Sequence, residues 1–356
     1  MIMGEPQPIL DPLTRAAIFL VATIDEGGEP AIRDLLADLS GLRRSVGFRL
    51  SGSDLTCCAG IGSAAWDRLF AGPRPAELHE FPGYDGDRHE APATPGDLLF
   101  HIRAESQDAC FELAMAIGER LRGAATIVDE TIGFRYLEMR DLLGFVDGTE
   151  NPEGRLAQSA AIVGAEDPDF AGGSYVVVQK YTHDLDTWNA LPVDEQEHVI
   201  GRTKLSDFEL SDEEKPLNSH VAVNTLYDAD GNQLQIVRAN MPFGSVQAGE
   251  FGTYYIAYAA TPTVIEQMLE RMFLGSDEAA YDRILDFSTA VTGTLFFAPS
   301  TDFLDDPPEA PESELSGDID PGDSDPGDSD LLDDLPDAAP TGDGSLGIGT
   351  LKSTQA

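Results

Sequence analysis

The sequence predicts an α+β fold made of two copies of one unit, each an antiparallel sheet covered by helices. The strand-like segments 16–24 and 174–181 begin about 158 residues apart, and the segments 98–103 and 253–258 begin about 155 residues apart. Each later strand in a half leads directly into an amphipathic helix, as in an α+β unit. The halves repeat in element order and not in residue identity, so duplication of one unit is the economical explanation.

Hydrophobic patterning predicts the elements of the first half. Residues 16–24 (AAIFLVATI) form a short apolar run with the length and composition of a buried strand. The helix predicted at 108–122 has an apolar face of Phe111, Met115, Ile117 and Leu121. The first half is predicted to contain, in addition, strands at 47–50, 98–103 and 131–137, a helix at 34–42, and a loop-rich stretch at 52–97 with a short helix near Trp66–Leu69.

The second half is predicted in the same way. Thr261 and Pro262 form a helix start, with an N-cap residue followed by proline at the first helical position. The predicted elements are strands at 174–181, 221–224, 235–238 and 253–258, and helices at 186–200 and 262–273.

Composition excludes several classes of protein. The net charge of −42 opposes binding to nucleic acid or to anionic lipid, because phosphate contacts require Lys and Arg. No apolar run approaches the length of a membrane span, and the N-terminus lacks the basic-then-apolar order of a signal peptide, so we expect a cytoplasmic protein. The three cysteines suit neither a disulfide framework nor a CxxC zinc site.

The charge is concentrated at the C-terminus. Residues 301–356 hold 16 acidic residues against one basic residue, Lys352. A segment of this composition buries too little apolar surface to offset the entropy of ordering it. We therefore predict a disordered acidic linker at 301–344. Residues 345–356 begin with the apolar sequence SLGIGTL, which is typical of a docking peptide.

The sequence GFVDGTENP, residues 144–152, presents one carboxylate on a loop. Gly148 allows a sharp turn, and Asn151-Pro152 favours another. Asp147 follows the apolar Phe145-Val146, an order that delivers an acid into a pocket. An acidic turn between two elements would explain the same local pattern, since Asp-Gly turns are common.

Two further residues could carry chemistry. His220 lies between a polar loop and the apolar segment Val221–Val223, where a histidine is either a ligand or a hydrogen-bonded structural residue. Arg238 follows Leu234, Ile236 and Val237, an unusual position for a guanidinium unless it faces a pocket. An arginine at a rim, paired with a carboxylate, would explain that position equally well.

Together these residues resemble the dye-decolourising peroxidase family over residues 14–300. The resemblance is carried by GFVDGT with Asn151-Pro152, then His220, Arg238-x-Asn240, and Val291-Thr292-Gly293 before Phe296-Phe297. It implies a duplicated ferredoxin-like fold, with an N-terminal half at 1–140 and a haem-binding C-terminal half at 141–300. It also implies one haem b per chain and peroxide-dependent oxidation of dyes, phenols and similar one-electron donors. The compact loops look like the bacterial intracellular subgroup. The alternative function is a deferrochelatase-like protein that binds haem or releases its iron without peroxidase turnover.

The resemblance also implies roles for individual residues. His220 would be the proximal iron ligand, with its other nitrogen donating to Asp282 or to Asp286; Asp282 is favoured by position. On the distal side, Arg238 would stabilise charge on the breaking O–O bond, Asp147 would shuttle the peroxide proton, and Asn240 would orient peroxide or water. Arg202, Thr149 and Asn151 would contact the haem, with Arg202 pairing with a propionate.

The tail has a resemblance of its own. Residues Ser345–Lys352 resemble the cargo-loading peptide of proteins packaged in encapsulin nanocompartments. In that reading, Leu346, Ile348 and Leu351 would enter apolar pockets on the inner wall of the shell. The predicted partners are therefore an encapsulin shell, hydrogen peroxide, small aromatic reductants and further copies of this chain.

Overall fold

The structure is a computed structural model that describes residues 4–50 and 52–311, and these residues belong to one compact unit. The greater part of the predicted linker and the whole predicted targeting peptide, 345–356, lie outside the described residues. Over the described ranges, no helix combines the length and the apolar character that crossing a membrane requires.

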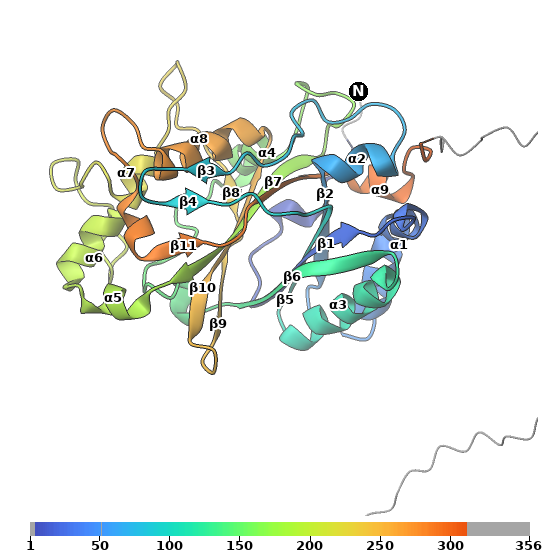
Figure 1. Ribbon diagram of the computed structural model, residues 1–356, viewed down its shortest axis with the longest axis horizontal. Helices are drawn as coiled ribbons and strands as arrows, with labels where there is room; N and C mark the ends of the chain where they lie inside the picture. The colour runs from blue at the N-terminus through green and yellow to red at the C-terminus, as the bar shows by residue number, and fades with distance from the viewer. Residues whose placement is uncertain (1–3, 51, 312–356) are drawn as a thin grey trace, which may run out of the picture. The chain divides into compact units, whose positions relative to one another are not determined.

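The first half contains an antiparallel sheet with helices packed on it (Figure 1). Its elements are η1 (Pro8–Leu10), β1 (Ala16–Ile24), α1 (Glu29–Gly47), β2 (Thr56–Gly62), α2 (Ser63–Leu69), β3 (Tyr84–Asp85), β4 (Glu90–Ala91), β5 (Leu98–Ala104), α3 (Gln107–Leu121), β6 (Ala125–Phe134) and η2 (Leu137–Met139). The main strands lie in the order β6-β1-β5-β2. The fourth, first, third and second strands of a β-α-β-β-α-β unit are adjacent in this order, which is a ferredoxin-like arrangement.

The second half repeats this arrangement. Its elements are α4 (Gly154–Ala161), β7 (Ser174–His183), α5 (Leu185–Ala190), α6 (Val193–Ile200), α7 (His220–Asn224), β8 (Val237–Arg238), β9 (Met241–Ser245), β10 (Glu250–Ala259), α8 (Pro262–Phe273), η3 (Arg283–Asp286), β11 (Ser288–Ala290), β12 (Thr294–Ala298) and α9 (Thr301–Asp305). The strand order is β12-β7-β10-β8, with β11 also paired to β7 and β9 to β10. The predicted α+β fold with antiparallel sheets and covering helices is confirmed. The exact boundary between halves, at residues 140 and 141, stays a prediction.

The two sheets join edge to edge into one. Phe296 and Phe297 of β12 pair with Gly62 and Ile61 of β2. Close approach at this junction requires glycine, because a Cβ atom on Gly60 would lie 2.9 Å from the Cβ of Phe296. The glycine-containing run TCCAGIG therefore forms a strand between two neighbours that bond its backbone on both sides.

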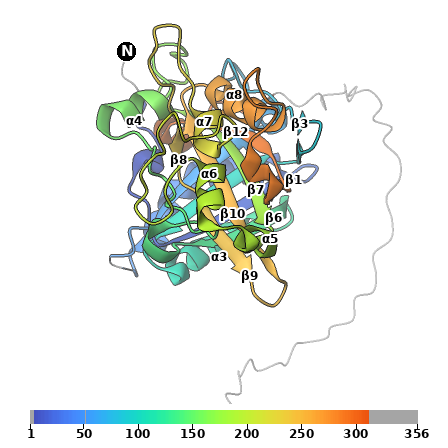
Figure 2. The same cartoon turned by 90° about the vertical axis from the view of Figure 1, so that its left-hand side faces the viewer.

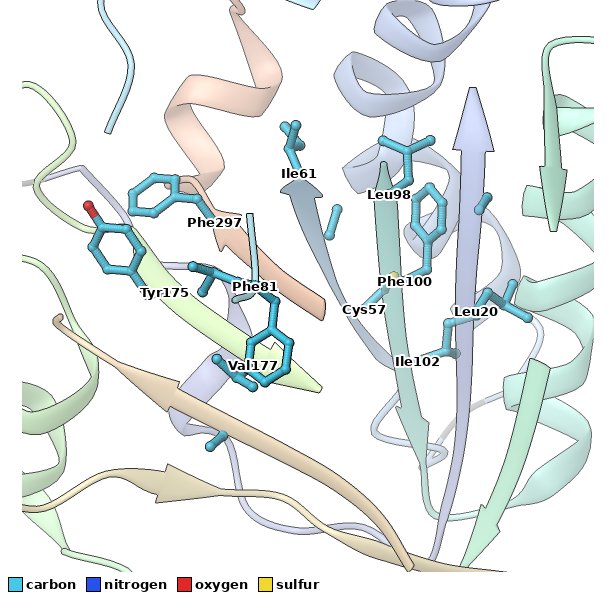
Figure 3. Packing of buried hydrophobic residues seen from close by; sticks show 14 of the residues in the cluster. Leu20, Cys57, Ile61, Phe81, Leu98, Phe100, Ile102, Tyr175, Val177 and Phe297 are labelled. Carbon is cyan, nitrogen blue, oxygen red and sulfur yellow. The ribbon is translucent and has the colours of Figure 1, made fainter. Parts of the chain in front are cut away.

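The main hydrophobic core lies on the face of the sheet that the helices cover. Side chains from both halves point to this face, among them Leu20, Phe100, Val177 and Phe297 (Figure 3). Helices α1 and α3 cover the first half of the sheet. In the second half α7 and α8 lie together and close the same face (Figure 2).

A second core lies on the opposite face, where the sheet curls back on itself. Strands β6 and β9 stand far apart in the strand order, yet they contact each other. The contact is close, since a Cβ atom on Gly133 would lie 2.5 Å from the Cβ of Met241. The curled sheet encloses buried side chains from both halves, including Phe19 and Tyr254.

Several predicted elements differ from the structure. Residues 47–50 are not a strand, because α1 continues to Gly47, with Val46 packed in the core. Strand β2 lies in a stretch that was predicted to be mainly loop, since its glycines and small residues hide a strand whose partners are distant in sequence. The helix predicted at 186–200 is broken into α5 and α6, because Pro192 lacks the N–H that a helix interior needs.

Two further predictions were wrong: one about the type of element at 221–224 and one about the buried face of α3. Residues 221–224 belong to helix α7 and not to a strand; the β-branched valines favour strand, but Val223 donates its N–H to the carbonyl of Ser219. On α3, Phe111 and Met115 are exposed, and the buried face contains Cys110, Leu113, Ile117 and Leu121.

The ordered part of the chain also extends beyond residue 300, where the linker was predicted to begin. Ser300 caps α9 by accepting the N–H of Phe303. The Phe303 ring packs against Trp66 and Phe70, and Leu304 is buried. Apolar burial thus outweighs the acidic composition at the start of this segment.

Candidate active site

The loop that carries Asp147 is fixed by backbone hydrogen bonds. Asp147 donates its N–H to the carbonyl of Met139 over 2.9 Å. Gly144 and Gly148 both have left-handed backbone conformations, with φ of +93° and +81°, which side chains on L-residues rarely allow. A side chain at position 144 would also collide with Lys204, whose Cε would lie 2.6 Å from the added Cβ. The predicted kinked loop is thus present.

Asp147 lies beside Asn240 and Arg238. Asn240 donates from Nδ2 to Oδ1 of Asp147 over 3.2 Å, and its own Oδ1 accepts the N–H of Ile256 over 3.1 Å. The amide is therefore held at both ends and holds the carboxylate. Arg238 stands on the short strand β8, and its buried Nε atom has no hydrogen-bond partner among the described residues. A buried donor without a partner is costly unless it serves a ligand.

Asn151 acts from behind this group. Its Nδ2 donates to the carbonyl of Arg238 over 2.7 Å, and its Oδ1 accepts the N–H of Arg238 over 2.9 Å. Both polar atoms of the amide are occupied by the backbone of β8. Asn151 does not line the cavity, so the structure gives it a positioning contact in place of the cofactor contact that was predicted.

His220 is the first residue of α7 and is backed by a buried carboxylate. Its Nδ1 lies 2.7 Å from Oδ2 of Asp282, which is fully buried. Asp282 accepts a second hydrogen bond from Asn224 and a third from the N–H of Ile284. A carboxylate accepts from Nδ1–H, so Nε2 carries the free lone pair.

The choice between Asp282 and Asp286 is decided by these contacts. Asp286 lies 3.2 Å from Nε2 of His89 and accepts from the hydroxyl of Tyr281. Among the described residues, Asp286 makes no hydrogen bond or ion pair with His220. The carboxylate that was favoured from its position in the sequence is therefore the one beside the histidine.

One large cavity brings these groups together. It encloses about 1400 Å³, including the part open to solvent. His220, Asp147, Arg238 and Asn240 all line it. Part of its apolar lining comes from α8 and the segment before β8, with Met268, Leu269, Met272, Leu234 and Ile236.

Arg202 and Thr149 stand at the same cavity in an ion-pair network. Arg202 donates from Nε to Asp207 over 2.9 Å and from Nη1 to Glu150 over 2.8 Å. Thr149 donates its hydroxyl to Asp207 over 2.8 Å. Both predicted residues therefore line the cavity, and three carboxylates, Glu150, Asp207 and Glu209, surround the guanidinium.

Sequence reasoning missed a partly buried acid in the cavity wall, Asp141. One carboxylate oxygen accepts the N–H of Phe145 over 2.9 Å. Burial raises the pKa of Asp141 to about 7, the hydrogen bond from Phe145 opposes this, and the neighbouring charge of Asp147 adds to it. Asp141 lies three positions before Gly144, so its position in the loop that carries Asp147 could have identified it from the sequence.

A histidine was missed as well. His183 lies between the hydroxyls of Ser288 and Thr253, at 2.9 Å and 3.0 Å, and all three line the cavity. Burial lowers the pKa of His183 to about 4, so the ring is neutral at physiological pH. The alternation of Gln179, Tyr181 and His183 along β7 was the available signal, since residues two apart share a face.

These features define a peroxidase-type site. A histidine is backed by a carboxylate, an acid lies with a guanidinium and an amide in the same cavity, and a duplicated ferredoxin-like fold carries them all. Comparison with known proteins gives the family. The models of the Dyp-type peroxidase family match residues 6–135 with the N-terminal domain and residues 138–303 with the C-terminal domain. The chain belongs to the Dyp-type peroxidase family.

Similar proteins agree with this assignment along almost the whole chain. A dye-decolorizing peroxidase of Rhodococcus erythropolis is 60% identical over 347 residues, which cover 98% of this chain and 97% of the relative. One of Mycobacterium tuberculosis is 61% identical over 309 residues, covering 87% and 92%. The chain is therefore a peroxidase of the dye-decolourising type. A deferrochelatase of Escherichia coli is 28% identical over 176 residues and covers 45% of this chain.

Solved structures show the same fold. The encapsulated DyP-type peroxidase from Mycobacterium smegmatis, solved by cryo-EM, has a TM-score of 0.85 and 64% identity, covering 86% of this chain and 100% of that one. A variant of DypB from Rhodococcus jostii in complex with heme has a TM-score of 0.83 and 52% identity, covering 86% and 99%.

Proposed function

We propose that the large cavity holds one haem b and that this chain uses it to oxidise dyes, phenols and similar one-electron donors with hydrogen peroxide. The observation that carries the proposal is the His220–Asp282 pair in one cavity with Asp147, Arg238 and Asn240. A related protein, DypB, is described in complex with heme. His220 would bind the iron through Nε2, because Nδ1 is engaged by Asp282.

The residues present suit this cofactor. The methionine- and leucine-rich side of the cavity suits an apolar macrocycle. Arg202 at the same cavity supplies a guanidinium for a propionate, since guanidinium and carboxylate pair through two parallel hydrogen bonds. Among the described residues no three His, Cys, Asp or Glu side chains gather as a metal-binding group. The iron of a bound haem would be held by His220.

Bound haem supplies the redox-active iron at which peroxide is reduced. Asp147 takes a proton from the attacking peroxide oxygen and returns it to the departing one. Arg238 stabilises the negative charge that develops as the O–O bond lengthens. Asn240 keeps Oδ1 of Asp147 in place through its Nδ2 donor, and Asp282 keeps the imidazole in the tautomer that binds metal.

The proposal is tested with His220→Ala and with a matched control, His79→Ala. His79 is partly exposed and pairs with Glu266, away from the cavity lining. The first variant should lose most bound haem or its histidine-ligated absorption spectrum, and the control should keep both. A His220→Ala protein with a normal Soret band and full peroxide-dependent dye oxidation would refute the ligand assignment.

The iron-releasing alternative makes a different prediction for the same assay. A pure haem carrier needs a ligand and an apolar cleft, and it has no need of the distal acid and guanidinium. Arg238→Leu should therefore slow the reaction with peroxide by roughly 100-fold if the chain is a peroxidase. An unchanged rate, with iron released from haem, would favour the alternative.

We further propose that residues Ser345–Lys352 load the chain into an encapsulin shell in the cytoplasm. The proposal rests on the apolar sequence SLGIGTL after an acidic linker and on the 64% identity with an encapsulated relative. Deleting 345–356 should abolish co-purification with a co-expressed shell while haem content and turnover stay unchanged. Replacing Leu346, Ile348 or Leu351 by Asp in the full chain should weaken loading, because a charge would enter an apolar pocket. Full loading of the truncated chain would refute this proposal.

A further inference from the structure

Four aromatic rings form a column through the interior of the curled sheet. Phe19 stacks on Tyr254 with ring centroids 4.0 Å apart and on His101 with centroids 4.8 Å apart, both at interplanar angles of 16°. His101 in turn lies 6.1 Å from Tyr258 at 22°. All four side chains are buried. Three separate strands, β1, β5 and β10, supply these rings, so the column crosses the junction of the two halves.

One end of the column adjoins the active site. Tyr254 pairs with Met241 across β10 and β9, and Met241 lines a smaller pocket of about 410 Å³ together with Asp147 and Asn240. The next residue along β10, Tyr255, lines the large cavity. The column therefore starts directly behind the wall that carries the distal residues.

The other end is a hydrogen-bonded pair that the proposed reaction does not use. The hydroxyl of Tyr258 lies 2.8 Å from Nδ1 of His101. Burial, reinforced by the positive charge of Arg103, holds the pKa of His101 well below its usual range, so the ring is neutral. A neutral imidazole can accept the phenol proton at Nδ1. Nε2 of His101 has no partner among the described residues.

Stability does not explain this cluster. Arg103 is buried beside the pair, and its guanidinium donates to backbone carbonyls of the N-terminal segment, those of Pro8 and Asp11. Its Nε and the Nε2 of His101 are left without partners in the described residues. Polar groups buried in this way cost free energy, and apolar side chains of similar shape would be neutral or better.

We propose that Tyr258, paired with His101, is a redox-active residue that donates an electron to the active site when no external donor is at hand. The stacked rings of His101, Phe19 and Tyr254 shorten the gaps along the path to the cavity wall. The function is protective, because an oxidising equivalent that leaves the cavity is held on a buried phenol until an external donor returns the electron.

The step balances with the peroxidase reaction. Reduction of one hydrogen peroxide to two waters takes two electrons and two protons. Tyr258 supplies one electron, its O–H bond breaks, and the proton binds Nδ1 of His101 and stays in the cluster. With no external donor present, the second electron would come from the bound haem, which stays oxidised by one electron until a donor reduces it, and both protons for water come from the solvent side of the cavity. The low pKa of His101 makes the transfer reversible, so the proton returns when the phenoxyl is reduced.

The experiment is freeze-quench electron paramagnetic resonance of the haem-loaded full chain, mixed with hydrogen peroxide without a dye. Wild type should give a tyrosyl radical, and Tyr258→Phe should lose most of that signal. The matched control is Tyr175→Phe, which changes a buried tyrosine on β7 outside the column and should keep the signal. An unchanged radical in Tyr258→Phe, or its loss in Tyr255→Phe instead, would overturn the proposal.

A second measurement stands even where Tyr258→Phe fails to fold. In wild type exchanged into D₂O, electron–nuclear double resonance should show one strongly coupled deuteron hydrogen-bonded to the phenoxyl oxygen, donated by His101. His101→Leu should remove that coupling and leave the Soret band unchanged. A wild-type radical without such a deuteron would place it on a different tyrosine and refute the pair.

Discussion

Replacing Asp141 by asparagine should change how folding stability depends on pH, in a direction that the structure fixes. The side chain is partly buried in the cavity wall, and its carboxylate accepts the N–H of Phe145. Asparagine keeps an oxygen acceptor for that bond but carries no charge. The variant therefore separates the titration of the group from its place in the loop.

The magnitude follows from the pKa of Asp141, which burial raises from 3.8 to about 7. Between these two values the folded chain holds a proton that the unfolded chain has lost, so stability falls as pH rises through this window. Above pH 7 the carboxylate costs the fold roughly 4 kcal/mol. From about pH 5 to about pH 8, wild type should lose roughly 2–3 kcal/mol relative to Asp141→Asn.

The assay is urea unfolding of the haem-loaded proteins, followed by circular dichroism at both pH values. The control is Asp169→Asn, which changes an exposed carboxylate and should follow wild type at each pH. The reasoning would be refuted by parallel pH dependences of wild type and Asp141→Asn between these pH values. A change in the slope with urea would show instead that the variant alters the extent of unfolding.

Three further predictions concern the same site. In urea titrations, His183→Gln should lose less stability than wild type on acidification, by up to about 2 kcal/mol. The pKa of His183 is about 4 in the folded chain and 6.5 in the unfolded chain. Wild type therefore loses stability as pH falls through that window. Asp282→Asn should speed transfer of haem to apomyoglobin by about 10-fold or more, since the carboxylate that holds His220 loses its charge; an unchanged rate would contradict this. Gly144→Ala and Gly123→Ala should each cost about 1–3 kcal/mol in urea, because both glycines have positive φ and the only added contact at Gly144 is the flexible end of the Lys204 side chain; a much larger cost at Gly144 would show that this contact matters.

Sequence reasoning found the residues whose chemical role can be inferred from their immediate neighbours in the chain. Asp147 follows an apolar pair and precedes a glycine, and the structure presents it on a loop. Arg238 sits among apolar residues because it belongs to a short strand facing a cavity. The sequence alone is enough to detect these residues, because the neighbours that explain them are adjacent in the chain.

What the sequence missed depends on contacts between distant segments. The sequence of β2 predicts a loop, because the segment is a strand only through its hydrogen bonds to β5 and β12 on its two sides. The sequence does not distinguish Asp141 from the many other acidic residues, because its low solvent exposure arises only in the folded cavity wall. The stacking of Phe19 between His101 and Tyr254 joins three strands, and no periodicity within one strand reveals it.

Two partly buried groups of the cavity wall, Asp141 and His183, affect the pH dependence of stability in opposite directions. Between about pH 4 and 6.5 the fold holds an extra proton on Asp141 and lacks one on His183. Their contributions to the pH dependence of stability have opposite signs there and largely cancel. The physical consequence lies in the cavity: folding leaves the carboxyl and the imidazole both neutral, although each would be charged in water over most of this window. This part of the wall then presents little fixed charge to an apolar macrocycle. The groups proposed to act on peroxide are instead Asp147, which would exchange a proton with it, and Arg238, which would meet the negative charge of the breaking O–O bond.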